Sequence, residues 1–322
     1  MKAVYRTSYT DSSGIVLKEL PIPEPQSDEI QIKVIATSVS RTDLGVLTGW
    51  PWIMRLFVGW PKPRNPIPGT DFTGKVTKVG NLVSDFDEGE MVWGMKDNGI
   101  GSHAEYFCTG AFKHLQKLPQ GIDPVIAAAC IEGAHYAINF INKLDLQPED
   151  RALVIGGTGG IGSAAIQLLK AKRIHVTAVS LGQVDRVKAL GADRVINGLE
   201  ENFLDCGEQF HAILDAVGKS RFTICKPLLY PKGSYLSSEL GPNWENIFLA
   251  LTTPILSNKK VIFPLPQDLK GSLSKMSELL LKKQFNPLID RVISLAEIQE
   301  AYSYVSQGKK IGNVIVKMDP EI

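Results

Sequence analysis

The sequence predicts an α/β protein in which a doubly wound parallel sheet is inserted into a β-rich domain. Short β-type runs separated by Pro, Gly and Asp fill 1–124, strands alternate with helices over 125–287, and β-type runs return over 288–322. At 322 residues the chain also exceeds the size at which one hydrophobic core usually stops growing. We therefore expect one domain made of 1–124 plus 288–322, and a second made of 125–287.

The first region contains alternating polar and apolar residues at 31–36, 73–80 and 90–94, a pattern typical of half-buried strands. The segment 45–68 differs, because it holds three of the chain's five tryptophans among Pro and Arg. We expect a long loop or a short helix that lies over a surface. Loops of this length are often functional.

The central region alternates between strand and helix patterns. It begins with Ala-rich helical spacing over 124–142 and a compact apolar strand at 151–155. The later elements are a helix from 164, a strand at 175–179, a helix at 184–190, and strands at 195–196 and 212–214. Such alternation implies right-handed crossovers and a parallel sheet covered by helices on both faces.

The last region resembles the first in pattern, with strands at 287–293 and 313–317 and a helix at 295–305. Before it, the longest apolar run, 247–256, is shorter than the ~20 residues of a membrane span, and Pro254 interrupts it. We expect this run to form a buried helix or a subunit contact, and we expect no membrane span.

The composition excludes several classes of protein. Hydrophobic residues make up 44% and charged residues 21%, as in ordinary globular proteins, and the net charge is +1. This balance gives no argument for a nucleic acid or an anionic membrane as partner, and peripheral membrane association stays open. The four cysteines form no CxxC pair, and the N-terminal residues lack the pattern of a signal peptide. We expect a cytoplasmic protein.

A glycine-rich turn follows the strand 151–155. Gly157, Gly159 and Gly162 satisfy the pattern G-x-G-x-x-G between a strand and an Ala-rich helix, which is the context that makes the pattern informative. One glycine permits a tight turn, one lets the backbone approach a pyrophosphate, and Gly162 lets helix and strand pack closely. The helix N-terminus favours phosphate charge. The residues expected to hold a dinucleotide are Gly157, Thr158, Gly159, Gly160, Ile161 and Gly162.

The end of the next strand bears on the choice of dinucleotide. Ser180 follows 175–179, and no acidic residue occurs before Asp185. A carboxylate there would hold the ribose 2′-hydroxyl of NAD and repel a 2′-phosphate, whereas a hydroxyl tolerates it. We therefore expect NADPH in preference to NADH. Arg186 could reach the phosphate, or it could be a solvated charge on the helix.

Motifs along the whole chain resemble those of a known superfamily. They are GTDFTGKV at 69–76, GGTGGIG at 156–162, LGADRVI at 190–196, DAVGKS at 215–220 and GKKIGNV at 308–314. In order and spacing they resemble the medium-chain dehydrogenase/reductase superfamily, and within it the zinc-free quinone oxidoreductase-like members. The resemblance implies a GroES-like catalytic domain around a Rossmann dinucleotide-binding domain, and a homodimer.

The resemblance also bears on zinc. The first cysteine ligand of the superfamily's alcohol dehydrogenases corresponds to Ser40, and their His-Glu pair corresponds to Thr70 and Asp71. Their last cysteine ligand would fall near Ile131, next to Cys130. Because a catalytic zinc normally has three protein ligands and only Asp71 qualifies, we expect no metal.

Without a Lewis acid, oxidation of simple alcohols is disfavoured. Hydride delivery to an electrophilic small molecule, such as a quinone or an α,β-unsaturated carbonyl compound, can proceed with positioning and a hydrogen-bond donor. Two alternatives stay open: an alcohol dehydrogenase that works without zinc, and a dinucleotide-binding protein without turnover.

By position in resembling proteins, Arg41, His135 and Tyr136 are the candidate catalytic residues. Arg41 could donate a hydrogen bond to a carbonyl oxygen, or it could pair with Asp43 or Asp71. His135 or Tyr136 could donate a proton to the reduced acceptor, or serve only the structure. Further cofactor contacts implied by the resemblance are Ser180, Val217, Gly218, Ser237, Phe263 and Asn313.

Overall fold

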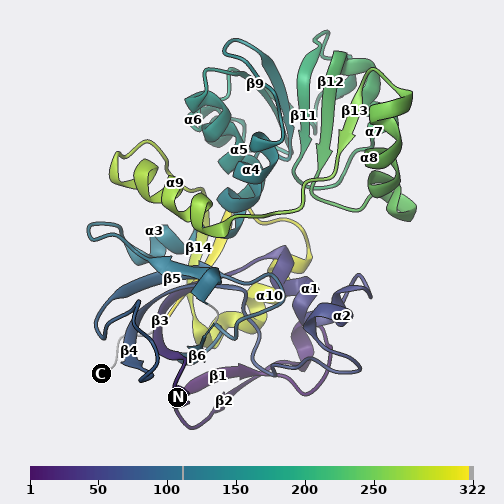
Figure 1. The fold of residues 1–322 in the computed structure, drawn as a ribbon. Coiled ribbons are helices and arrows are strands. Elements are labelled where there is room, and N and C mark those ends of the chain that lie inside the picture. The colour runs from purple at the N-terminus through teal and green to yellow at the C-terminus, as the bar shows by residue number, and fades with distance from the viewer. Residues whose placement is uncertain (111, 319–322) are drawn as a thin grey trace. The chain divides into compact units, whose positions relative to one another are not determined.

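The computed structural model describes residues 1–110 and 112–318. The chain divides into two compact units (Figure 1): unit 1 combines Met1–Glu132 with the chain from Asp268 onward, and unit 2 is Gly133–Gln267. The doubly wound sheet of unit 2 is thus inserted into the β-rich unit 1, as the fold class predicted. The borders differ from 124 and 288, because the helices at 124–128 and 269–281 pack on strands of unit 1.

Unit 1 is built on a seven-stranded sheet with the order β14-β15-β3-β4-β5-β7, to which β6 adds by pairing with β3. Its strands are β3 (Ile30–Val39), β4 (Asp71–Val79), β5 (Met91–Met95), β6 (Tyr106–Thr109), β7 (Leu115–Lys117), β14 (Ile289–Ser294) and β15 (Asn313–Lys317), and β1 (Lys2–Tyr5) with β2 (Val16–Glu19) forms a separate pair. The alternation at 31–36 predicted a half-buried strand, but β3 is buried along most of its length. It lies between β15 and β4 and packs against helices, so both of its faces are covered.

The helices of unit 1 cover this sheet and its margins. They are α1 (Arg41–Thr48), α2 (Met54–Val58), α3 (Pro124–Ala128), α9 (Leu269–Leu281) and α10 (Ile298–Ser306). The core between β3, β4 and α10 includes Val34, Phe72 and Tyr302, all fully or nearly fully buried. Burying such side chains contributes roughly 1.5–3 kcal/mol each. The predicted loop at 45–68 contains the end of α1 and the short helix α2.

Unit 2 contains a six-stranded sheet with the order β10-β9-β8-β11-β12-β13, and all its neighbouring strands are parallel. The strands are β8 (Arg151–Ile155), β9 (His175–Ser180), β10 (Arg194–Asn197), β11 (Phe210–Asp215), β12 (Leu229–Ser237) and β13 (Lys260–Ile262). The helices are α4 (Glu132–Asn142), α5 (Gly160–Ala171), α6 (Val184–Ala189), α7 (Phe222–Cys225) and α8 (Glu245–Leu256). Figure 1 shows α5 and α6 beside β9, and α7 and α8 beside β12 and β13.

The apolar run 247–256 lies in α8, and the expectation of a buried helix is wrong. Phe248, Leu251, Ile255 and Leu256 are all exposed, and Ile255 is 84% exposed. Their spacing places them along one side of the helix, while the other side packs on β13. The alternative expectation, a subunit contact, stays a prediction. None of the helices described here is long and apolar enough to cross a bilayer.

Candidate active site

The glycine-rich turn connects β8 to α5 in unit 2. Gly156 has a φ of 87°, and the amides of Gly156 and Gly157 both donate to Val179 O, which fixes the turn against β9. A Cβ at Gly162 would lie 2.1 Å from Gly156 O, so no larger residue fits there without movement. The close helix–strand packing expected at Gly162 is therefore present.

The N-terminus of α5 has no side-chain cap. Its N-cap residue is Gly159, which has no side chain to accept hydrogen bonds from the first amides of the helix. These amides have no partner within a helix, and they carry the positive end of the helix dipole. Gly160 and Ile161 begin the helix, so their backbone N–H groups are suited to a pyrophosphate, whereas the amide of Gly159 donates to Gly156 O at 3.0 Å.

Ser180 ends β9 on the same edge of the sheet. Its side chain is buried, and Oγ has no hydrogen-bond partner in the structure. The loop after it is held by Asn197, whose Oδ1 accepts from Gly182 N at 3.0 Å. A buried hydroxyl without a partner costs about 1–3 kcal/mol, so this position is suited to binding a ligand rather than to a purely structural role.

The other predicted cofactor residues of unit 2 also follow the carboxyl ends of parallel strands. Val217 and Gly218 come after β11, Ser237 ends β12 and Phe263 follows β13, so all lie on the edge where doubly wound sheets bind ligands. Asn313 belongs to unit 1, where it opens β15 and its Nδ2 donates to Leu288 O at 3.1 Å.

His135 and Tyr136 lie in the first turn of α4. The amide of Asn139 has a fixed orientation, because its Oδ1 accepts from Gln267 N at 2.8 Å. Its Nδ2 therefore donates to His135 Nδ1 at 3.2 Å and to His135 O at 2.9 Å. An Nδ1 that accepts a hydrogen bond leaves the proton of the neutral ring on Nε2. His135 is buried, whereas Tyr136 is partly exposed.

In unit 1, Asp43 and its partners hold the start of α1. Ser40 is the N-cap, and Asp43 Oδ2 accepts from Ser40 N at 2.9 Å and from Ser40 Oγ at 2.8 Å, forming a capping box. Thr70 Oγ1 donates to the other carboxylate oxygen at 2.9 Å. Burial raises the pKa of Asp43 well above its usual range, as do the charges of Asp71 and Glu132. The carboxyl group of Asp43 is therefore buried and accepts hydrogen bonds through both oxygens, which fits a structural role.

Asp71 forms a second buried cluster at the start of β4. Its Oδ1 accepts from Ser38 N at 2.7 Å and its Oδ2 from Ser38 Oγ at 2.6 Å. Burial raises the pKa of Asp71 to about 6, although the Ser38 hydrogen bonds oppose the rise. Nearby, His103 Nε2 donates to Ser38 O at 2.9 Å and its Nδ1 accepts from Tyr302. Burial lowers the pKa of His103 to about 4, so this ring is neutral and structural.

The positions that hold zinc ligands in related alcohol dehydrogenases are occupied in this chain by residues that cap a helix, bond to Asp43 or pack in the core. Ser40 caps α1, Thr70 bonds to Asp43, and Ile131 is a fully buried apolar residue. Among the residues that the structure describes, no group of three or more His, Cys, Asp and Glu side chains is placed to hold a metal ion.

Two further residues, Glu132 and Lys310, lie near these carboxylates. Glu132 accepts a hydrogen bond from Thr42 Oγ1, which ties the segment before α4 to α1. Lys310 Nζ donates to Gly312 O at 2.7 Å, and burial lowers its pKa against the opposing charges of Glu132 and Asp290. In the sequence Lys310 cannot be told from its neighbour Lys309, which is exposed.

Two family models match the chain. A model described as an alcohol dehydrogenase GroES-like domain matches residues 26–120, and one described as a zinc-binding dehydrogenase matches residues 190–316. The second match excludes positions 40, 70 and 131, so its name says nothing about the residues at the zinc positions.

Full-length relatives agree with these matches. A chloroplastic quinone oxidoreductase of Triphysaria versicolor is 29% identical, with 98% of both chains covered. A chloroplastic NADPH-dependent alkenal/one oxidoreductase of Arabidopsis thaliana is 27% identical over 96% of this chain and 78% of the relative. The chain belongs to the medium-chain dehydrogenase/reductase superfamily. Within this superfamily it groups with the quinone oxidoreductase-like members.

A solved structure of the quinone oxidoreductase from Coxiella burnetii has the same fold. It aligns with a TM-score of 0.87 at 23% identity and covers 99% of both chains. A GroES-like unit interrupted by a Rossmann unit is the arrangement predicted from the sequence, and this prediction of the superfamily fold is confirmed.

Proposed function

We propose that the chain is an NADPH-dependent oxidoreductase that transfers a hydride to a quinone or to an α,β-unsaturated carbonyl compound, without zinc. One observation carries the proposal: the binding edge of unit 2 combines an uncapped glycine-rich turn with the unpartnered, buried hydroxyl of Ser180. These groups match what a pyrophosphate and a phosphorylated ribose require. The relatives named as quinone and alkenal/one oxidoreductases support the class of acceptor.

The preference for NADPH rests on the end of β9. Ser180 stands where NAD-specific sites place a carboxylate, and the next acidic residue, Asp185, lies within α6. A 2′-phosphate can therefore approach without a negative charge beside it, and the Ser180 hydroxyl can donate to it.

The absence of zinc is supported by the hydrogen bonds of unit 1. Ser40 Oγ and Thr70 Oγ1 both use Asp43 as acceptor, and neither is a side chain of the kind that holds a catalytic zinc. Hydride transfer then depends on orientation of the acceptor and on hydrogen-bond donors around it.

When bound, the nicotinamide supplies the hydride, and the chain supplies binding and hydrogen-bond donors. Hydride addition leaves negative charge on the acceptor, which a proton donor must neutralise. We assign His135 the role of hydrogen-bond donor to this charge, because the amide of Asn139 keeps the ring proton on Nε2, and solvent supplies the transferred proton. Tyr136 is the second candidate donor, and Arg41 the candidate hydrogen-bond donor to the carbonyl oxygen.

Replacement of His135 tests this assignment. In His135→Phe we expect kcat to fall about 100-fold while the Kd for NADPH stays unchanged, because the ring would act after cofactor binding. His135→Gln keeps a donor and should retain more activity than the Phe variant. Equal activity of both variants and wild type, with a lower melting temperature in each, would assign His135 to structure alone.

The surface of unit 2 supports a homodimer. β13 is the last strand at its side of the described sheet, and α8 next to it exposes Phe248, Leu251 and Ile255. A free strand edge beside an apolar helix face is typical of contacts between identical chains. The four cysteines are free, which supports a reducing compartment such as the cytoplasm.

The experiment for the whole proposal has two stages. Thermal unfolding with NADPH and with NADH measures which dinucleotide binds, and NADPH should raise the melting temperature more. Consumption of NADPH is then followed with a panel of quinones and enals, and alcohols are offered with NADP⁺. Stabilisation by NADPH without turnover of any acceptor would favour a binding protein, and alcohol oxidation would favour a dehydrogenase.

A further inference from the structure

A second surface of the molecule, in unit 1, is both apolar and basic. Five large apolar side chains between α1 and the segment after α2 are more than half exposed, and we call them the α2 face: Trp50, Trp52, Leu56, Phe57 and Trp60. Trp50 is 71% and Trp60 69% exposed. Monomeric proteins rarely expose so many large apolar side chains together, so this patch requires a partner.

The α2 face is held by an ordered backbone. The hydroxyl of Tyr9 donates to Gly59 O, and Asn98 Nδ2 donates to Phe57 O at 3.2 Å. Arg55 Nε donates to Gly49 O at 3.3 Å, and its guanidinium lies 4.8 Å from the centre of the Tyr9 ring. Buried Val58 anchors α2 from below. The tryptophans are thus presented by a fixed segment rather than by a loose loop.

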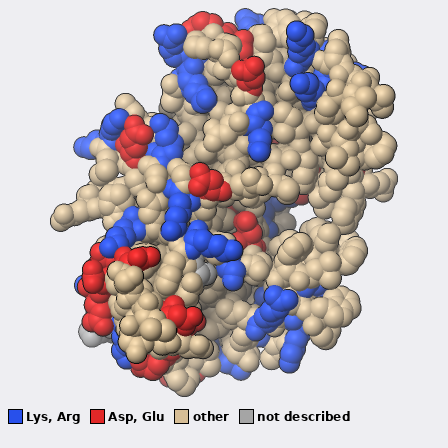
Figure 2. All heavy atoms as spheres, in the orientation of Figure 1, with Lys and Arg blue, Asp and Glu red and all other residues tan. Residues whose placement is uncertain are grey.

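The charged residues within the segment that forms the α2 face are of one sign. The chain contains Arg55, Lys62 and Arg64 but no Asp or Glu between residues 44 and 70, although its net charge is only +1. In Figure 2 the surface over α1 and α2, at the lower right, carries blue side chains among tan ones. The local charge is therefore positive in a nearly neutral protein.

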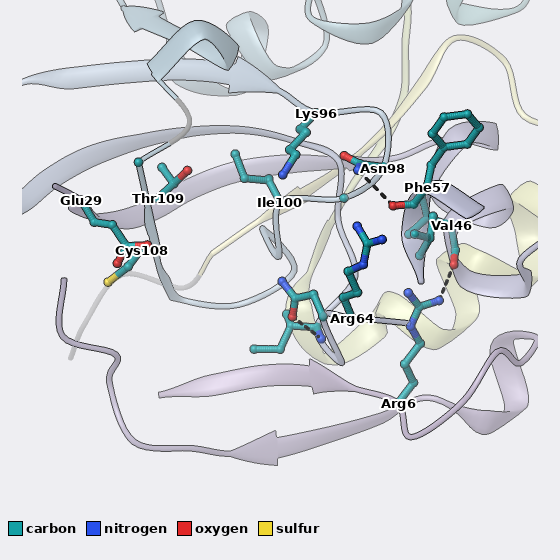
Figure 3. A pocket seen from close by; sticks show the side chains of 15 residues that line it. Arg6, Glu29, Val46, Phe57, Arg64, Lys96, Asn98, Ile100, Cys108 and Thr109 are labelled. Atoms are coloured by element: carbon teal, nitrogen blue, oxygen red, sulfur yellow. Dashed lines mark hydrogen bonds between the residues drawn. The ribbon is translucent and has the colours of Figure 1, made fainter. Parts of the chain in front are cut away.

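A basic pocket of about 350 Å³ adjoins this face, and Phe57 is part of its lining. Arg64 and Lys96 enter it from opposite sides, with Arg6 beyond Arg64 (Figure 3). The acidic lining residue, Glu29, lies with Cys108 and Thr109 at the other end of the pocket (Figure 3).

Arg6 is the most unusual member of this lining. Its side chain is 2% exposed, its Nη1 donates to Val46 O, and its Nε has no hydrogen-bond partner. Among the described residues no carboxylate lies within ion-pair distance of it. A buried cation without a counter-charge is costly, so the pocket favours an anionic group beside it.

We propose that the α2 face and the basic pocket dock unit 1 onto the surface of an anionic phospholipid bilayer. Trp side chains favour the headgroup level of a bilayer, and Arg and Lys next to them are attracted to anionic lipid phosphates. The exposed face of α8 differs from the α2 face in charge, because residues 246–258 include no charged side chain. An uncharged face suits a second copy of the chain, whereas the cations of the α2 face select an anionic surface.

Vesicle co-sedimentation of the full chain, without cofactor, tests the proposal independently of the reaction. We expect binding to vesicles of phosphatidylcholine mixed with phosphatidylglycerol, little binding to phosphatidylcholine alone, and weaker binding at high salt. Trp50→Ser with Trp60→Ser should strongly reduce the blue shift of tryptophan fluorescence on mixed vesicles, because Trp52 is then the one tryptophan left in the α2 face. Arg64→Gln with Lys96→Gln should weaken binding about fivefold for each cation removed.

Leu82→Ser with Leu199→Ser is the matched control, since it removes apolar side chains of similar exposure that lie outside both the α2 face and the α8 face. This control should bind mixed vesicles like the wild type, and melting temperatures should show that all variants are folded. The proposal is overturned if the wild type ignores mixed vesicles, or if folded α2-face variants still bind them fully. It is also overturned if the tryptophan variant instead converts a dimer to a monomer, because the face would then be a contact between copies.

Discussion

Unit 1 and unit 2 both place polar groups at the ends of their central strands, but the two sets of groups differ in their hydrogen-bond partners. In unit 1, Asp43 and Asp71 accept hydrogen bonds from hydroxyl and amide groups of the same unit. In unit 2, the first amides of α5 have no side-chain cap and the Ser180 hydroxyl has no partner among the described residues.

This difference distinguishes polar groups that stabilise the fold from polar groups that can bind a ligand. Groups that satisfy one another contribute to the folded state and leave nothing for a ligand, whereas unsatisfied groups cost free energy until a ligand pairs with them. On this view, the positions that hold zinc in related dehydrogenases have become part of the scaffold of unit 1, and ligand binding depends on unit 2.

The largest expected effect concerns the scaffold of unit 1. Asp71→Ala would leave the amide and the hydroxyl of Ser38 without their acceptor, so we expect a loss of about 2–5 kcal/mol in the free energy of unfolding. Denaturant unfolding measures this loss. A loss below about 1 kcal/mol would break the comparison, because the Asp71 cluster would then not be a stabilising element.

Asp71→Asn is the milder variant, and it tests the titration. The folded-state pKa of Asp71, about 6, lies above that of an unfolded Asp. The stability contributed by this shift is complete below the unfolded pKa and is lost as pH rises through about 6. The melting temperature of the wild type should therefore fall across this window relative to Asp71→Asn, and parallel curves for the two proteins would contradict the assignment.

A pair of glycine variants tests the unit 2 turn. At Gly159 an added Cβ would lie 3.4 Å from its nearest heavy atom, Gly156 O, so Gly159→Ala should leave stability within about 0.5 kcal/mol. It should weaken NADPH binding at least about tenfold by occupying space that the pyrophosphate needs. Gly162→Ala should instead lower stability by about 1–3 kcal/mol through overpacking. Calorimetric titration and thermal unfolding distinguish the two results, and unchanged binding in Gly159→Ala would remove the turn from the site.

Substitutions of Ser180 also test the dinucleotide site of unit 2, and we expect smaller effects on NADPH binding from them. Ser180→Asp should weaken NADPH binding about tenfold and leave NADH binding equal or better, because a carboxylate repels the 2′-phosphate and accepts from the 2′-hydroxyl. Ser180→Ala should weaken NADPH binding less and should not destabilise the protein, since the hydroxyl has no internal partner. A clear loss of stability in Ser180→Ala would show that Ser180 belongs to the scaffold.

The smallest effect on stability is expected at α8. Leu251→Lys changes an exposed side chain, so the free energy of unfolding of the chain alone should change by less than about 0.5 kcal/mol. The mass measured by light scattering should nevertheless fall from dimer to monomer, because a charge would be buried in the contact. A monomeric wild type would contradict the proposed dimer.

The fold was predictable because its signals are local. The run from the strand at 151–155 through Gly162 into an Ala-rich helix identified the Rossmann unit, and each glycine has a steric reason visible in the chain itself. The unit borders were less accurate, because the packing of α3 and α9 on the strands of unit 1 depends on contacts distant in sequence.

The site could be predicted only in part for the same reason. Ser180 was found because it ends a strand, but its lack of a partner depends on neighbours from other segments. Likewise, the bond between Thr42 and Glu132 joins residues far apart in the chain. The exposed face of α8 could not be told from a buried one by hydrophobicity, which does not report what covers a helix.

The position of β15 has a consequence for biosynthesis. β15 comes after every other strand in the chain, yet it lies inside the sheet of unit 1, between β14 and β3. During translation β3 is therefore synthesised long before its neighbour β15. All six strands of unit 2 are synthesised before β15. Unit 2 should fold first on the ribosome, and nascent unit 1 should be the part that needs protection from aggregation.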